Sequence, residues 1–164
     1  MRTKTAVWAS VLAALAFVAC ASALQSSAQA PGQQLAASTI PQAGLMQPAE
    51  LNALLKGPAS ARPLVLQVGS RMLFAESHIA GSEYAGPGAS ADGLAALRNR
   101  VQSLPRNKSI VIYCGCCPWS HCPNIGNAYK LMHDMGFTHV KALYLADNFG
   151  ANWVSQGYPV DRGQ

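Results

Sequence analysis

A run of β-branched residues that ends in a cysteine constrains the fold of this chain more than any other feature. Residues 110–113 read Ile-Val-Ile-Tyr, which is typical of a buried strand. Cys114 follows at once, and the next eight residues hold three more cysteines before a helix-forming segment begins near Pro123. A strand that ends at a thiol close to a helix N-terminus can stabilise a sulfur anion.

Strand and helix patterns alternate along the chain. Short apolar strands are predicted at 64–68, 109–113 and 140–145, and helices at 48–57, 90–104, 125–135 and 148–156, with a helical turn at 74–78. This alternation predicts an α/β fold, a single domain whose mostly parallel central sheet has helices on both faces. Ligands of such sheets bind beyond the carboxyl ends of the strands, where Cys114 is expected.

The loop that follows Cys114 is expected to hold an anion. Its backbone N–H groups can point at a negative charge on the Cys114 sulfur. The helix near Pro123 adds its positive end, and proline at the first helical position would put Cys122 at the N-cap. The sequence therefore predicts a lowered pKa for the Cys114 thiol and an anion-binding pocket around it.

The first 30 residues have the pattern of an export signal. Arg2 and Lys4 precede an uncharged apolar run at 6–19, and Ala21-Ser22-Ala23 resembles a cleavage site. The apolar run is too short for a typical transmembrane helix. We therefore expect a periplasmic or secreted protein.

Three segments follow from this pattern: a signal peptide at 1–23 with cleavage between 20 and 30, a flexible leader at 24–47, and the domain at 48–164. The leader is rich in Ala, Gln, Ser, Pro and Gly and carries no charge. In an alternative interpretation, residues 17–20 form a weak lipoprotein box and Cys20 carries a lipid. Such an anchor would be the protein's only contact with a membrane.

The charge of the chain gives no indication of a nucleic-acid partner. Twelve basic and seven acidic residues give a net charge of +5. Removal of the signal peptide takes away Arg2 and Lys4, which leaves a net charge of +3. Because no dense stripe of Lys and Arg occurs, no nucleic acid is expected to bind.

Three kinds of chemistry remain open for the loop cysteines. Export to an oxidising compartment permits disulfides, and the C-x-x-C spacing of Cys114 and Cys117 is that of a redox pair. Four thiols with a nearby histidine could instead hold Zn or Cu(I), and that site would comprise Cys114, Cys116, Cys117 and Cys122, with His121. The third chemistry is nucleophilic catalysis by Cys114.

Several short motifs, in order and spacing, resemble those of the rhodanese-like sulfurtransferases over residues 48–162. The matching segments are Gln67-Val68-Gly69 with Phe74 and His78-Ile79-Ala80-Gly81; Val111-Ile112-Tyr113-Cys114; Met132 with Gly136-Phe137 and Val140; and Trp153 with Gly157-Tyr158-Pro159-Val160. The resemblance implies a rhodanese-like fold in which the strand-end cysteine lies in the active site.

The family's chemistry implies that Cys114 is the nucleophile. It would accept a sulfane sulfur as a persulfide and pass it to a thiophilic acceptor, with Cys122 as a resolving thiol. The partners would be a small sulfur-donor anion and a thiol or cyanide, without a cofactor. The expected substrate loop comprises Gly115, Cys116, Cys117, Trp119, Ser120, His121 and Asn124. The alternatives on an inactive rhodanese fold are a periplasmic thiol–disulfide redox protein or a module that binds Zn or Cu.

The chain departs from the family's usual pattern at three charged positions. Gln67 and Gly69 stand where the family usually has Asp and Arg, and Asn124 stands where an Arg is usual near the helix start. The loop from Cys114 to Asn124 contains neither Arg nor Lys. An anionic donor such as thiosulfate would therefore depend on backbone dipoles, or on His121 when it is protonated.

Overall fold

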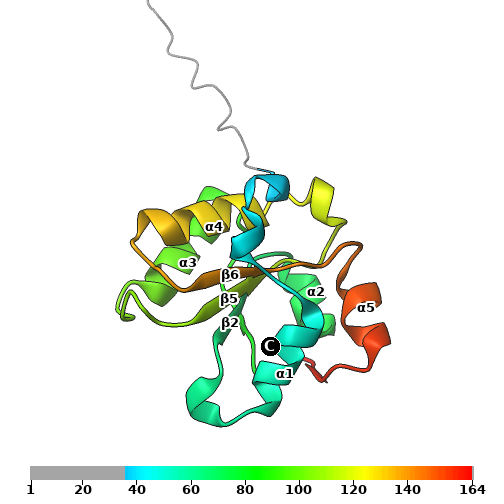
Figure 1. Ribbon diagram of the computed structural model, residues 1–164. Helices are drawn as coiled ribbons and strands as arrows, with labels where there is room; N and C mark the ends of the chain where they lie inside the picture. The colour runs from blue at the N-terminus through cyan, green and yellow to red at the C-terminus, as the bar shows by residue number, and fades with distance from the viewer. Residues whose placement is uncertain (1–35, 164) are drawn as a thin grey trace, which may run out of the picture. The chain divides into compact units, whose positions relative to one another are not determined.

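Five strands form the central sheet of the computed structural model, which describes residues 36–163. The strands are β1 (Leu45–Met46), β2 (Leu64–Gln67), β4 (Glu83–Tyr84), β5 (Ile110–Tyr113) and β6 (Val140–Leu143). They lie in the order β1-β6-β5-β2-β4, and every pair of neighbours is parallel (Figure 1). The predicted α/β fold with a mostly parallel sheet is confirmed.

The remaining elements are helices and a small second sheet. The helices are α1 (Pro48–Lys56), α2 (Arg71–Glu76), α3 (Ala91–Val101), α4 (Ile125–Asp134) and α5 (Phe149–Asn152). The second sheet pairs β3 (His78–Ile79) with β7 (Val160–Asp161) in antiparallel fashion. The helix expected at 148–156 is shorter than predicted, because Trp153 leaves the helical conformation and a 3₁₀ turn at 154–156 follows it.

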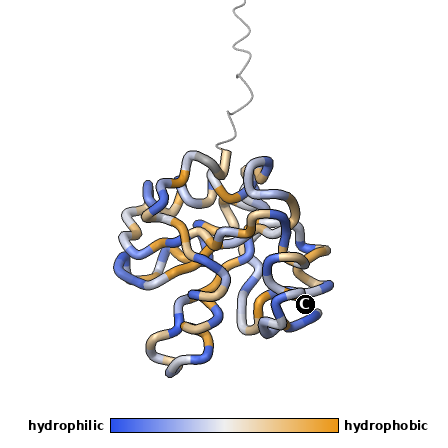
Figure 2. The backbone as a smooth tube through the Cα atoms, turned by 45° about the vertical axis from the view of Figure 1, so that its right-hand side comes forward, coloured by the Kyte–Doolittle hydropathy of each residue, from blue (hydrophilic) through white to orange (hydrophobic). Residues whose placement is uncertain are grey.

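Helices cover both faces of the central sheet, and successive side chains of β5 pack against opposite faces. Ile110 and Ile112 pack into one apolar cluster with the buried sides of α3 and α4. Val111 and Tyr113 point the other way, into a cluster with residues of α1 and with Trp153. Figure 1 shows α3 and α4 on one side of the sheet and α1 on the other. In Figure 2 the strands through the centre are largely hydrophobic, which is typical of parallel strands buried on both faces.

The folded domain begins earlier than the predicted boundary at residue 48. Strand β1 adds an edge to the sheet by pairing with β6, and a 3₁₀ turn at Ala37–Thr39 precedes it. The side chains of Ala37 and Ile40 are buried in the core. Residues 36–47, assigned above to the flexible leader, are therefore part of the domain.

The predicted signal peptide, its cleavage site and the lipid anchor at Cys20 lie outside the described residues. Among residues 36–163, no helix is long and apolar enough to cross a bilayer.

Candidate active site

Cys114 lies directly after β5, at the carboxyl edge of the sheet and close to its centre. Its side chain is 6% exposed and lines a cavity of about 360 Å³. Leu73, Phe149 and Val154 supply apolar walls to this cavity. The position of Cys114 beyond the end of a buried strand agrees with the sequence-based expectation.

Three thiols meet at this edge. The Cys116 sulfur lies 3.0 Å from the Cys114 sulfur and 3.4 Å from the Cys117 sulfur. Cys114, Cys116, Cys117 and Cys122 are all free thiols. Cys116 lines the same cavity as Cys114, whereas Cys117 and Cys122 line a separate space of about 10 Å³ on the other side of Cys114.

The negative charge of the cluster belongs on Cys116 rather than on Cys114. Hydrogen bonding to Cys116 and Cys122, together with burial, raises the pKa of the Cys114 thiol. Hydrogen bonding from Cys114 and Cys122 holds the pKa of Cys116 well below its ordinary value. The predicted lowering of the Cys114 pKa is therefore wrong for the free-thiol form, because Cys114 keeps its proton and donates a hydrogen bond to the half-buried sulfur of Cys116.

The backbone amides are divided among the sulfurs of Cys114, Cys116 and Cys122 rather than gathered around Cys114 alone. The backbone N–H of Cys116 donates to the Cys114 sulfur. The amides of Asn124 and Ile125, at the start of α4, donate instead to the Cys122 sulfur. The N-cap of α4 is Asn124 rather than Cys122, because the helix begins at Ile125, two residues later than Pro123 predicted. The sulfur of Cys122 nevertheless accepts from these two amides and faces the positive end of α4.

Asn124 takes the place of a cationic group beside the sulfurs. Its amide Nδ2 donates to the Cys114 sulfur at 3.3 Å and to the Cys116 sulfur at 3.8 Å. Its Oδ1 accepts from the backbone N–H of Ala89 at 2.9 Å. The side chain is 7% exposed, so this neutral donor is fixed in orientation and can stabilise a thiolate at either sulfur.

Gln67 and Gly69 join the end of β2 to the cysteine loop. The Gln67 amide donates to the carbonyl of Cys114 and accepts from the backbone N–H of Gly69 at 3.1 Å. A Cβ on Gly69 would lie 3.0 Å from the Cys114 sulfur. In place of the usual charged residues, Gln67 therefore makes neutral hydrogen bonds to the cysteine loop, and Gly69 leaves room for the Cys114 sulfur.

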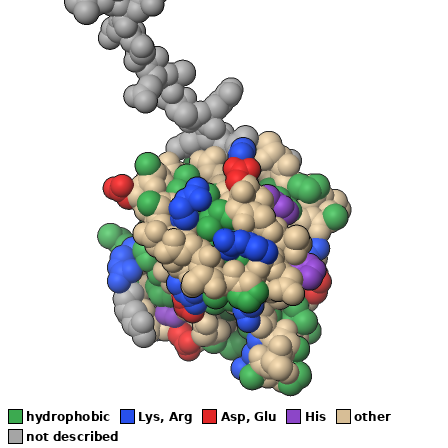
Figure 3. All heavy atoms as spheres, turned by 90° about the vertical axis from the view of Figure 1, so that its left-hand side faces the viewer, with side chains coloured by type: hydrophobic (Ala, Val, Ile, Leu, Met, Phe, Trp, Pro, Cys, Tyr) green, Lys and Arg blue, Asp and Glu red, His purple; other side chains and the backbone are tan. Residues whose placement is uncertain are grey.

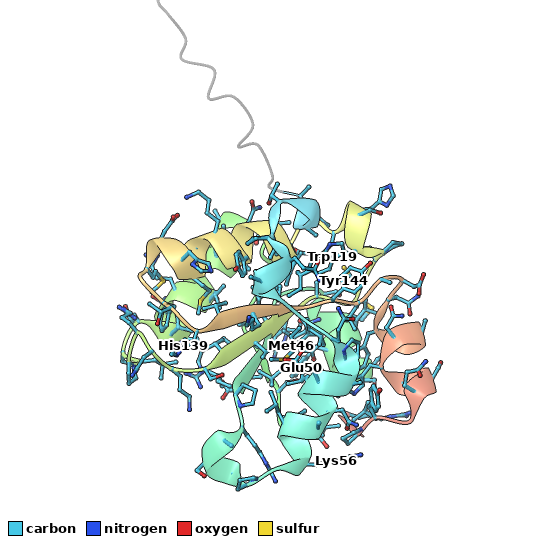
Figure 4. The ribbon with its side chains drawn as sticks, viewed as in Figure 1. Met46, Glu50, Lys56, Trp119, His139 and Tyr144 are labelled. Atoms are coloured by element: carbon cyan, nitrogen blue, oxygen red, sulfur yellow. The ribbon has the colours of Figure 1, made fainter. Side chains whose placement is uncertain are left out.

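The polar side chains in the outer part of the loop do not contact the thiols, although the Cys117 thiol donates to the carbonyl of His121 at 3.9 Å. Trp119 packs edge-on against Tyr144, with ring centroids 5.2 Å apart, and the two residues are labelled close together in Figure 4. The side chains of Ser120 and His121 are exposed and hydrogen-bond to each other. Trp119 lines the small space beside Cys117 and Cys122, so of these three predicted loop residues it alone lies at a sulfur-lined cavity.

The three clustered thiols form a donor set suited to a soft metal ion. The sulfurs of Cys114, Cys116 and Cys117 all lie within 4.8 Å of one another. Thiolates favour Cu(I) or Zn, which agrees with the alternative drawn from the sequence, although Cys122 is not part of this group.

The segment at 86–89 supports Asn124 from the opposite side. Asn127 donates its side-chain amide to the carbonyl of Gly88 at 3.2 Å. A Cβ built on Gly88 would lie 2.2 Å from the backbone oxygen of Asn124, so the two backbones touch. This close approach fixes the start of α4 and, with it, the amide that faces the sulfurs.

Replacing Gly88 with alanine is expected to destabilise the protein, because the added methyl group must push α4 away from the 86–89 segment. We expect the free energy of unfolding to fall by about 1–3 kcal/mol, the usual cost of overpacking. Urea denaturation measures it. Gly57→Ala is the matched control, since the nearest atom to its Cβ would be 3.2 Å away. Equal losses in the two variants would contradict this account of Gly88.

The overall arrangement matches solved structures of rhodanese-like domains. The solution structure of the rhodanese-like domain of the Alr3790 protein from Anabaena superposes with a TM-score of 0.55 at 23% identity, covering 73% of this chain and 79% of that one. The chain has a rhodanese-like fold. The BH2092 protein from Bacillus halodurans also matches, with a TM-score of 0.55 at 22% identity over 72% of this chain and 76% of its own. No protein-family model and no curated protein matches the sequence.

Within the rhodanese-like fold, the cavity walls were not found from the sequence. Leu73, Phe149 and Val154 come from α2, α5 and the turn after α5. Leu73 is 40% exposed and Val154 is 42% exposed, and both line the cavity next to Cys114. Their positions in short, weakly periodic helices gave no signal, because only the tertiary fold brings them to Cys114.

Proposed function

We propose that this protein is a sulfurtransferase that carries sulfane sulfur as a persulfide on Cys114. The observation that supports it best is the Cys114 thiol at the end of β5, facing a cavity of about 360 Å³ and paired with a second thiol at 3.0 Å. Export to the periplasm, or secretion, remains part of the proposal and rests on the N-terminal sequence.

Cys116 supplies the base that activates Cys114. The Cys114 thiol hydrogen-bonds to the Cys116 thiolate across the 3.0 Å contact, and its proton passes to Cys116 as the Cys114 sulfur bonds to the donor. Asn124 donates to both sulfurs and stabilises the charge during this transfer. Because the pKa of Cys116 is lowered, the pair holds one negative charge at neutral pH. No separate histidine or lysine is needed for this step.

The character of the cavity favours a donor with little negative charge. Of the described residues that line it, none is basic, and Glu76 is acidic. Figure 3 views the side of the molecule away from α5, and there Lys and Arg side chains are spread among apolar and acidic ones without a continuous basic stripe. A small organic persulfide, with an apolar group against Leu73, Phe149 and Val154, fits this lining better than the thiosulfate dianion.

The transfer conserves atoms and charge. The Cys114 sulfur attacks the terminal sulfur of a donor R–S–SH while its proton passes to Cys116, and the bond between the two donor sulfurs breaks. The leaving group R–S⁻ takes the proton held on Cys116 and departs as R–SH. Cys114 then carries a persulfide, and Cys116 is again a thiolate. A thiol or cyanide can accept the terminal sulfur.

Rapid-quench peptide mapping tests the proposal. The full chain is mixed with a small organic persulfide and alkylated at early times, and its peptides are mapped by mass spectrometry. We expect one additional sulfur atom on Cys114, removed by cyanide as thiocyanate, and slower labelling by thiosulfate. Sulfur found only on Cys117 or Cys122, or on no cysteine, would show that the proposed function is wrong.

A further inference from the structure

Cys116 is the thiol best placed to react with a sulfur carried by Cys114. Its sulfur is 3.0 Å from that of Cys114 and lines the same cavity. We propose that Cys116 is the resolving thiol: it displaces the carried sulfur as hydrosulfide and leaves a Cys114–Cys116 disulfide. This inference rests on the proposed function, and it makes the protein a sulfane reductase as well as a carrier.

The geometry requires little movement. A disulfide bond is about 2.05 Å long, so the two sulfurs must approach by roughly 1 Å. Gly115 between them has φ +76°, and a Cβ there would lie 2.8 Å from the Cβ of Phe149. The backbone therefore turns tightly at Gly115, and the turn brings the flanking thiols together.

The two other thiols of the loop are placed less well. Cys122, the resolving thiol expected from the sequence, lines the space of about 10 Å³ next to Cys114 and accepts from the amides of Asn124 and Ile125. Cys117 lines the same small space. Neither lines the larger cavity, where the carried sulfur and its leaving path would lie.

The resolving step is balanced. The Cys116 thiolate attacks the inner sulfur, Sγ of Cys114, and the bond from Sγ to the terminal sulfur breaks with its electron pair on the terminal sulfur. The products are HS⁻ and the Cys114–Cys116 disulfide. The carried sulfur is reduced and the two cysteines are oxidised. The Asn124 amide, which donates to both sulfurs, stabilises the charge as it moves between them.

The cycle needs a dithiol reductant. Attack of an external dithiol on the Cys114–Cys116 disulfide returns both cysteines to thiols and leaves the reductant as a disulfide. Another reaction must therefore regenerate the external dithiol that reduces this protein. One equivalent of sulfide is released for each dithiol oxidised.

A single-turnover experiment on three full-length chains tests the inference. The wild type, Cys116→Ser and Cys122→Ser each receive one equivalent of a small organic persulfide at neutral pH. Intact mass gives the fraction of chains that take up a sulfur, and sulfide is expressed per loaded chain, since Cys116→Ser also lacks the base that promotes loading. Sulfide is measured, and disulfides are mapped after alkylation. Cys122→Ser is the matched control, because serine removes the thiol and keeps a side-chain acceptor for the amides of Asn124 and Ile125.

We expect about one sulfide per loaded chain and a Cys114–Cys116 disulfide in the wild type and in Cys122→Ser. Cys116→Ser should keep a stable persulfide on Cys114 and release at least tenfold less sulfide per loaded chain. A long-lived Cys114 persulfide in the wild type without sulfide would overturn the inference and leave the proposed function intact. So would undiminished sulfide from Cys116→Ser. A Cys114 that takes up no sulfur in any of the three chains would instead refute the proposed function.

Discussion

Replacement of Cys114 by serine is expected to lower the rate of sulfur transfer to cyanide by about a thousandfold or more. A serine hydroxyl has no accessible anion at neutral pH, and loss of a catalytic nucleophile commonly costs several orders of magnitude. The measurement is thiocyanate formation under saturating persulfide donor. Since Cys114 is small and buried, the variant should fold normally.

Two measurements make the Cys114→Ser result decisive. Urea denaturation should give a midpoint close to that of the wild type, which shows that activity is lost without unfolding. Cys122→Ser also removes a buried loop thiol, and it should keep most of the turnover. Full turnover in Cys114→Ser would move the nucleophile to another cysteine and reject the proposed mechanism.

Replacement of Asn124 by aspartate should shift the pH dependence of sulfur uptake upward by at least about one unit. The variant puts a carboxylate oxygen where an amide now donates to the Cys114 sulfur at 3.3 Å. At that separation, repulsion between two charges is about 5 kcal/mol for an effective dielectric of roughly 20, so the thiolate forms only at higher pH. At neutral pH, the rate of sulfur uptake by Asn124→Asp should therefore fall tenfold or more.

The Asn124→Asp experiment has a direct control on charge. Asn107→Asp adds the same charge at an exposed position away from the sulfurs, and its pH profile should overlay that of the wild type. Uptake is followed by quenched mass spectrometry across pH. An unshifted Asn124→Asp profile would mean that Asn124 does not influence the charge on the thiols.

The fold could be predicted from the sequence because local residue patterns determine its strands and the ends of its helices. The run at 110–113 is apolar on both faces, Ser90 caps α3 through its hydroxyl, and Gly136 follows α4 with φ +83°. These features depend on near neighbours in the chain. The same reasoning placed Cys114 at the strand end and Cys122 near the start of the helix.

The division of charge among the cysteines could not be predicted. Which thiol becomes the anion depends on the direction of the backbone after Gly115 and on the depth of each sulfur, and neither is encoded in spacing. Strand β1 was missed for a related reason. Residues 45–46 form a strand only because β6 offers a partner, and two residues carry no period of their own.

The two sulfurs of the proposed pair are held by very different parts of the molecule. Cys114 is attached to β5, which is hydrogen-bonded on both edges and enclosed by both apolar clusters. Cys116 belongs to an irregular segment whose hydrogen bonds to other backbone groups of the described chain lie only at its ends, from Phe149 to the carbonyl of Gly115 and from Trp119 to the carbonyl of Ala146. Slow exchange of amide hydrogens is thus expected to persist in the sheet through a full cycle of reduction and oxidation, while the segment after Gly115 changes its protection. The redox state of the two cysteines would then alter the conformation of the loop after Gly115, while the conformation of the central sheet would stay the same.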